Sequence, residues 1–280
     1  MAMRDGARAM TSLFIQQPRE SSIFASQQRW LMAQAGFALF YGCPALGKQP
    51  GLYSGRLVST IVDYDVASRN TAAVFMQEML AYRFVKYREN PPDRRTRLLD
   101  VTELALDPLR KWMHLHLSLL DHLDGGARVA TLAGNPAIFA SLEARIGYGI
   151  LENQRVRNPG EAFNLFTWAN AGGGVMDYFI GRIQEWSPEA EKIDIGPIVA
   201  ADLCRTFMIS KTHFKRLMKR ASEMGSLGFN GTGPGAGLWL SQGFIDEYRN
   251  YQAEKFAIID AAFEAEAAAL PVVRELTAIP

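Results

Sequence analysis

The feature that most constrains the fold is an internal repeat, because a chain that carries one pattern twice is expected to build one unit twice. The segments VASRNTAAVFMQEMLAYRFV and MISKTHFKRLMKRASEMGSL align with Ser68 on Ser210, at an offset of 210 − 68 = 142 residues. In each half an apolar helix is expected before the aligned segment, and a hairpin and a long amphipathic helix after it. At this offset the coinciding apolar pairs are Leu57 with Val199, Ile61 with Leu203, Val66 with Met208, Phe75 with Leu217 and Met76 with Met218.

Each copy predicts a helix, a turn, a second helix and a hairpin. Serine at positions 68 and 210 is typical of a helix N-cap, where its hydroxyl accepts a hydrogen bond from a backbone N–H. Short strands flank the polar tip ENPPDRRTR (89–97) in the first copy and NGTGPGAG (230–237) in the second. This is the order of elements in a winged helix. The sequence therefore predicts a mainly α chain with small β hairpins (α+β), in which tandem winged helix-turn-helix domains form an intrachain pseudo-dimer.

The length of 280 residues is sufficient for two domains. We expect a flexible N-terminal arm over residues 1–20, a first winged-helix domain over 21–126, and a second with bridging helices over 127–280. Cys43 and Cys204 lie in apolar contexts and predict reduced core thiols. The longest apolar run, residues 30–41, is shorter than the ~18 residues of a membrane span. With no apolar signal segment at the start, these features predict a cytoplasmic protein without a membrane partner.

The helix that follows Ser210 carries the strongest functional signal. In helix-turn-helix proteins the helix after the turn enters the major groove of DNA. Lysine and arginine on such a helix bind phosphates and guanine bases. The alternative is an ordinary solvated helix face. The candidate DNA contacts on this helix are Lys211, Thr212, His213, Lys215, Arg216 and Lys219.

The first copy places its positive charge on the hairpin instead of the helix. A basic hairpin tip is typical of a wing that contacts the phosphate backbone or the minor groove. The second hairpin tip has no charge, so the two copies predict an asymmetric DNA site. Because the net charge is only +1, any surface for nucleic acid must be a local patch. The candidate contacts of the first copy are Arg69, Asn70 and Thr71 on the helix and Arg94, Arg95 and Arg97 on the hairpin.

No motif predicts an enzyme, a cofactor or a metal site. His114 and His116 are two residues apart on an expected helix, so they point to different faces, and no third ligand completes a site. The run Gly172–Gly174 follows no strand and lacks the spacing of a nucleotide-binding loop. We therefore expect no catalytic residue and no metal ligand.

The order of elements resembles that of MarR-like winged-helix transcriptional regulators. The resemblance is carried by ISKTHFKRLMKRASEMGSL, by the hairpin GFNGTGPGAGLWLS and by the long terminal helix, over residues 190–270, and more loosely over 50–125. It implies a DNA-binding transcriptional regulator that responds to a small-molecule effector. It also implies a homodimer, whereas the duplication favours a monomer with internal pseudo-symmetry. The neutral net charge and the uncharged second hairpin favour an alternative, a winged-helix protein-interaction or ligand-sensing module without DNA binding.

Overall fold

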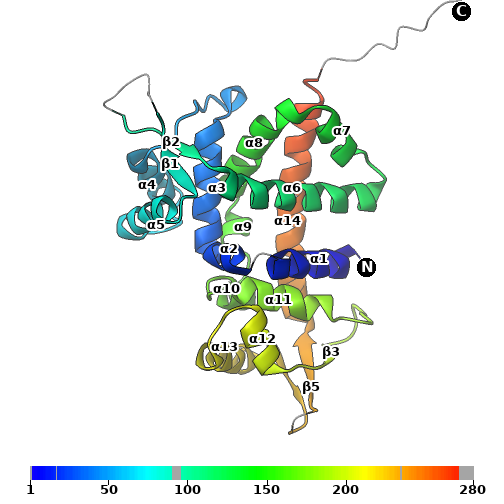
Figure 1. The fold of residues 1–280 in the computed structure, drawn as a ribbon. Coiled ribbons are helices and arrows are strands. Elements are labelled where there is room, and N and C mark those ends of the chain that lie inside the picture. Colours follow the sequence, from blue (N-terminus) through cyan, green and yellow to red (C-terminus); the bar gives the residue numbers. More distant parts are fainter. Residues whose placement is uncertain (1, 17, 90–95, 234, 271–280) are drawn as a thin grey trace, which may run out of the picture.

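The fold is described from a computed structural model (Figure 1), which covers residues 2–16, 18–89, 96–233 and 235–270. The chain is mainly helical (67% helix) with small antiparallel sheets, as the sequence predicts. The helices are α1 (Ala2–Gln16), α2 (Pro18–Ile23), α3 (Gln27–Tyr41), η1 (Pro44–Leu46), α4 (Ser54–Asp63), α5 (Arg69–Ala81), α6 (Glu103–Asp124), α7 (Arg128–Gly134), η2 (Pro136–Ile138), α8 (Phe139–Glu152), α9 (Gln154–Arg157), α10 (Glu161–Thr167), α11 (Gly172–Gly181), α12 (Ala200–Thr206), α13 (Lys211–Glu223) and α14 (Gln242–Ala267). The strands are β1 (Val85–Tyr87), β2 (Leu99–Val101), β3 (Lys192–Pro197), β4 (Leu227–Asn230) and β5 (Gly237–Ser241).

The N-terminal segment is helical, which corrects the expectation of a flexible arm over residues 1–20. Ala7, Met10 and Phe14 lie three or four residues apart, so they share one side of α1. Ala7 is buried, α1 packs along α11 (Figure 1), and the Arg8 side chain donates to the carbonyl oxygen of Gly181 at 2.6 Å. Charged residues between these apolar positions obscured the helical spacing in the sequence. The apolar side of α1 is explained by its packing against α11.

The two copies of the repeat adopt the same local backbone geometry. We call α4, α5, β1 and β2 the first unit, and α12, α13, β4 and β5 the second unit. Ser68 and Ser210 cap α5 and α13, each accepting from the backbone N–H three residues ahead. After these helices Arg83 and Gly225 both have a left-handed backbone, with φ of 62° and 70°, and they lie 225 − 83 = 142 residues apart. The offset of 142 therefore holds from the cap to the first hairpin strand.

The turn before each cap differs by one residue between the units. Asp65 and Met208 both have a left-handed backbone, with φ of 53° and 54°, and are 208 − 65 = 143 residues apart. The buried residues that follow them are Val66 and Ile209. The alignment of Val66 with Met208 was therefore wrong by one position, because the turn of the second unit is one residue shorter, and Met208 is 51% exposed.

A third segment joins the hairpin in each unit. In the second unit β3 pairs with β5 in the antiparallel order β3–β5–β4. In the first unit Leu52 forms a single bridge with Leu99 of β2, whose N–H donates to the Leu52 carbonyl at 2.8 Å. In both units the segment before the first helix thus pairs with the second hairpin strand. The β3 strand was not predicted from the sequence, and the first helix of the second unit, α12, begins after it at Ala200.

The long helices α6 and α14 leave the two hairpins and meet α3 and α8 in the middle of the molecule (Figure 1). The hydrophobic core is continuous across residue 126 and includes Leu117 and Ile259 from the two halves. Cys43 and Cys204 are buried free thiols, as predicted. No helix in the described part of the chain is both long and apolar enough to cross a membrane.

A buried guanidinium connects α7 to α6 and α14. Arg128 is 7% exposed, and it donates to the carboxylates of Asp121, Asp124 and Asp260 over 2.7–3.3 Å. Its hydrogen bonds hold the pKa of Asp124 at about 2. Because this carboxyl titrates below its ordinary value, its contribution to stability is complete above the unfolded-state pKa and is lost as the pH falls toward 2.

Replacing Arg128 by methionine should therefore destabilise the fold. The expected loss in the free energy of unfolding is about 2 kcal/mol, below the ~3–5 kcal/mol of a fully buried pair, because water reaches two of the three carboxylates. The exposed Arg155, whose side chain pairs with Glu254, provides the control, and Arg155→Met should leave the free energy of unfolding nearly unchanged. Urea unfolding at pH 7 measures both, and equal losses would contradict the structural role of Arg128.

Candidate nucleic-acid interface

The α13 helix presents a basic face opposite its buried face. The exposed residues of its first three turns are Lys211, Thr212, Lys215, Arg216, Lys219 and Arg220, and the buried ones are Phe214, Leu217 and Met218. With five cations and the single acidic residue Glu223, the helix carries 5 − 1 = +4 charges. Within the described ranges these cations form one ion pair, between Lys219 and Glu223 at 3.6 Å. The positive potential of this face is therefore largely uncompensated.

His213 lies at the edge of this face. Its side chain is partly buried, and its Nε2 atom is buried without a hydrogen-bond partner in the described structure. It faces a groove between α13 and α10 that Trp168 and Met224 also line. Of the six candidates on α13, His213 and the exposed Arg216 line this groove, and the other four are exposed and do not line it.

The α5 helix exposes a polar face with little charge. Arg69, Asn70 and Thr71 are all exposed at its N-terminal end, as expected from the sequence. The acidic residue Glu78 accepts from Arg29 of α3 at 2.6 Å, so its charge is neutralised within the fold. Arg69 is the one cationic residue in the sequence of α5, whereas α13 contains five.

The first hairpin holds one candidate arginine in place. The Arg97 guanidinium lies 3.9 Å from the ring centre of Tyr87 on β1, a distance typical of a cation–π contact. Arg97 is exposed, so its N–H groups remain open to an anion. Arg94 and Arg95 lie outside the described residues.

The two units lie in different parts of the molecule. In Figure 1, α5 lies at the left beside β1 and β2, α13 lies near the bottom beside α12, and β5 of the second hairpin extends downward. Such an arrangement leaves the exposed faces of both helices free of the long helices α6 and α14.

Comparison with known proteins finds no matching family model, no similar curated protein and no similar solved structure.

On α6, His114 is exposed and His116 is buried, so the prediction that they face different sides is confirmed. The His116 ring packs between Trp112 and Phe256, at 4.1 and 5.3 Å between ring centres.

Proposed function

We propose that the chain is a DNA-binding transcriptional regulator whose two units are diverged winged helices that form an intrachain pseudo-dimer. The observation that carries this proposal is the basic, mostly unpaired face of α13, on a helix that directly follows a short turn. The strand order β3–β5–β4, and its counterpart at Leu52 and Leu99, supports a winged-helix assignment for both units. The resemblance to MarR-like regulators is part of the same proposal.

In this proposal α13 enters one major groove and α5 the next. Residues at the N-terminal end of each helix meet base edges, and cations farther along contact phosphates. The proposed contacts of the second unit are Lys211, Thr212, Lys215, Arg216 and Lys219. The proposed contacts of the first unit are Arg69, Asn70 and Thr71 on α5, with Arg94, Arg95 and Arg97 on the hairpin. Because the units differ in charge, the DNA site is asymmetric.

Binding to duplex DNA at low salt tests this function. We expect fluorescence anisotropy with mixed genomic fragments to show a Kd in the micromolar range or tighter at ~50 mM salt. If about five phosphates are neutralised, the logarithm of the binding constant should fall with the logarithm of the salt concentration at a slope of roughly −4.5. The physical reason is the release of counterions that the cations of α13 displace.

The groove between α10 and α13 favours a second function, a winged-helix interaction or ligand-sensing module without DNA binding. Trp168 and Met224 in this groove are 46% and 38% exposed, and exposed apolar side chains together can mark a surface for a partner. Absence of any anisotropy change at micromolar protein and low salt would contradict the first function and favour this one.

A further inference from the structure

The groove between α10 and α13 is large enough for a segment of another protein. The two helices pack beside each other (Figure 1), and the groove has a volume of about 760 Å³. Its lining residues run from Glu161 to Ala169 on α10 and from His213 to Met224 on α13. At a rise of ~1.5 Å per helical residue, the groove is roughly 12–16 Å long. This length fits two to three turns of a helix from a partner.

Half of the residues that line the groove are apolar. Leu217 is buried, Leu165 and Ala169 are partly buried, and the exposed Trp168 and Met224 extend the apolar surface to solvent. An aromatic side chain in water beside other apolar groups is typical of a surface that a partner covers. Apolar side chains of a peptide can fill such a groove, whereas a DNA duplex presents a charged phosphate backbone to it.

The groove also carries two arginines without an anionic partner. Arg216 and Arg220 are one helical turn apart, so they lie on the same side of α13, and both are exposed. Neither forms an ion pair in the described part of the chain, and neither does Glu161, the one acidic residue of the lining. The lining therefore carries 2 − 1 = +1 charge. Because a guanidinium group binds a carboxylate through two parallel N–H donors, this arrangement favours an acidic occupant.

Two polar atoms of the lining residues lack a partner. Oδ1 of Asn164 and Nε2 of His213 are buried and form no hydrogen bond within the described ranges. A buried polar atom without a partner is unfavourable. Both atoms lie beneath the surface, so an occupant reaches them through rotation of the two side chains. A peptide offers N–H donors for the amide oxygen, and donors or acceptors for the imidazole nitrogen, whose role depends on the tautomer.

We propose that this groove binds an acidic amphipathic helix of a partner protein. Its apolar side chains, at positions i, i+3 and i+4, pack against Trp168 and Met224. Its carboxylates pair with Arg216 and Arg220. The proposal gives a partner class to the interaction function that the same groove favours.

This binding would oppose binding to DNA. Arg216 lines the groove and is also one of the proposed DNA contacts on α13. A partner helix that pairs with Arg216 therefore competes with a phosphate for the same guanidinium. The competition rests on the proposed DNA function, whereas binding of the acidic helix does not.

Fluorescence anisotropy with the full chain and a fluorescein-labelled peptide, DELFDELLDELL, tests the groove. We expect a Kd of ~100 μM or tighter at about 0.1 M salt. The neutral peptide NQLFNQLLNQLL should bind at least ~10-fold more weakly, because it has no carboxylate for the arginines. The peptide DEAADEAADEAA should also bind at least ~10-fold more weakly, because it lacks the apolar anchors.

Two variants should locate the binding in the groove. Trp168→Ala removes the aromatic contact and Arg220→Gln removes one guanidinium, and each should weaken binding of the acidic peptide at least ~5-fold. Lys215→Gln is the matched control, because it removes the same charge from an exposed position of α13 outside the groove. It should change the affinity for the peptide less than ~2-fold. Since Arg220 is exposed, its variant should keep the Tm of the unmodified chain and remains decisive if Trp168→Ala unfolds.

Three results would overturn the proposal: equal affinities for the acidic and neutral peptides, unchanged binding in Arg220→Gln, or no binding at about 1 mM protein. Sedimentation velocity of the chain alone adds a fourth, since a dimer that Trp168→Ala dissociates would show that a second copy fills the groove. DNA titrations separate this proposal from the DNA function. Lys215→Gln should weaken binding to DNA and not to the peptide, and Trp168→Ala should do the reverse. If only the peptide binds, the DNA function fails; if only DNA binds, the groove proposal fails.

Discussion

Replacing Lys215, Arg216 and Lys219 together by alanine should weaken binding to duplex DNA by about a hundredfold at ~0.1 M salt. All three side chains are exposed on the basic face of α13, where the proposal places phosphate contacts. Each lost contact removes roughly 0.9 from the salt dependence, so the slope should become shallower by up to ~2.7. Anisotropy titrations at several salt concentrations measure both quantities.

The three substitutions should not affect folding. Arg216 and Lys215 have no ion pair in the described structure, and the pair of Lys219 with Glu223 is long and exposed. The α13 helix is held to the core by its opposite, buried face, which these substitutions do not change. Alanine also favours a helix at least as well as lysine or arginine does. A loss of DNA affinity with an unchanged Tm would thus report on the interface alone.

A control variant of equal charge separates a local contact from a general effect of net charge. Arg110, Lys111 and Arg155 lie on α6 and α9, outside both proposed groove helices, and each forms an exposed ion pair. Replacing these three by alanine should change DNA affinity by less than about threefold. An equal loss in both triple variants would show that α13 has no special role, and no loss in either would contradict the assignment of α13 to DNA.

The repeat could be predicted from the sequence because local signals define it. A serine cap, a helical period and a polar hairpin tip act within a few residues, and the caps of α5 and α13 are confirmed. The β3 strand could not be predicted in this way. Its six residues, Lys192–Pro197, contain a glycine and a proline, and they become a strand through pairing with β5 more than forty residues later.

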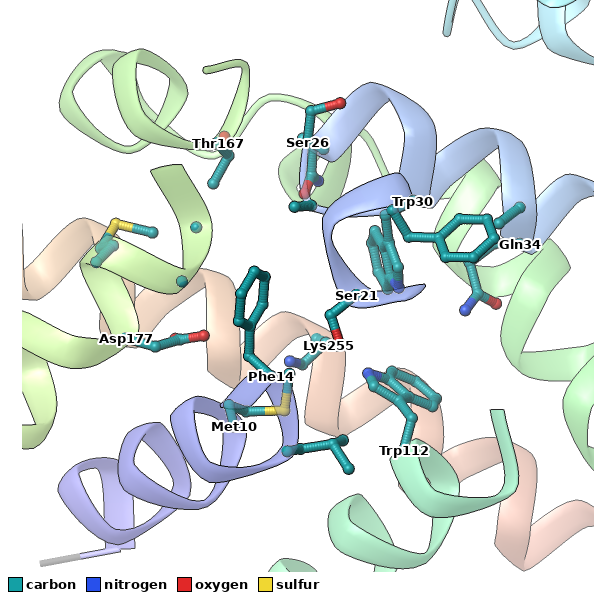
Figure 2. Close-up of a pocket in the computed structure, with 18 of the residues that line it drawn as sticks. Met10, Phe14, Ser21, Ser26, Trp30, Gln34, Trp112, Thr167, Asp177 and Lys255 are labelled. Carbon is teal, nitrogen blue, oxygen red and sulfur yellow. The ribbon is translucent and has the colours of Figure 1, made fainter. Parts of the chain in front are cut away.

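The cavity that Asp177 and Lys255 line (Figure 2) had no local signal in the sequence either. Asp177 and Lys255 are 255 − 177 = 78 residues apart, and only the packing of α11 and α14 brings them together. On α14 a lysine between Glu254 and Phe256 resembles a solvent-facing residue of an amphipathic helix. Its burial follows from α6 and α11 covering that face, which periodicity along one helix cannot indicate.

Replacing Gly172 by alanine should destabilise the protein by about 3 kcal/mol, the upper end of the cost of overpacking. A Cβ atom at this position would lie 1.9 Å from the carbonyl oxygen of Phe166, so backbone atoms would have to move. The break between α10 and α11 falls at residues 168–171, and Gly172 is the first residue of α11. Glycine thus stands where the chain turns back against α10.

The adjacent glycine provides the control for this prediction. A Cβ atom at Gly173 would meet no heavy atom within 4 Å, so Gly173→Ala should be neutral or should stabilise by up to ~0.5 kcal/mol through a smaller loss of backbone entropy. Thermal unfolding should show a Tm for Gly172→Ala that is lower by about 8 °C and a nearly unchanged Tm for Gly173→Ala. If the glycines served only as a flexible link, both replacements would stabilise the helix. Opposite effects at neighbouring positions therefore identify the close approach of α11 to Phe166 as the reason for glycine at position 172.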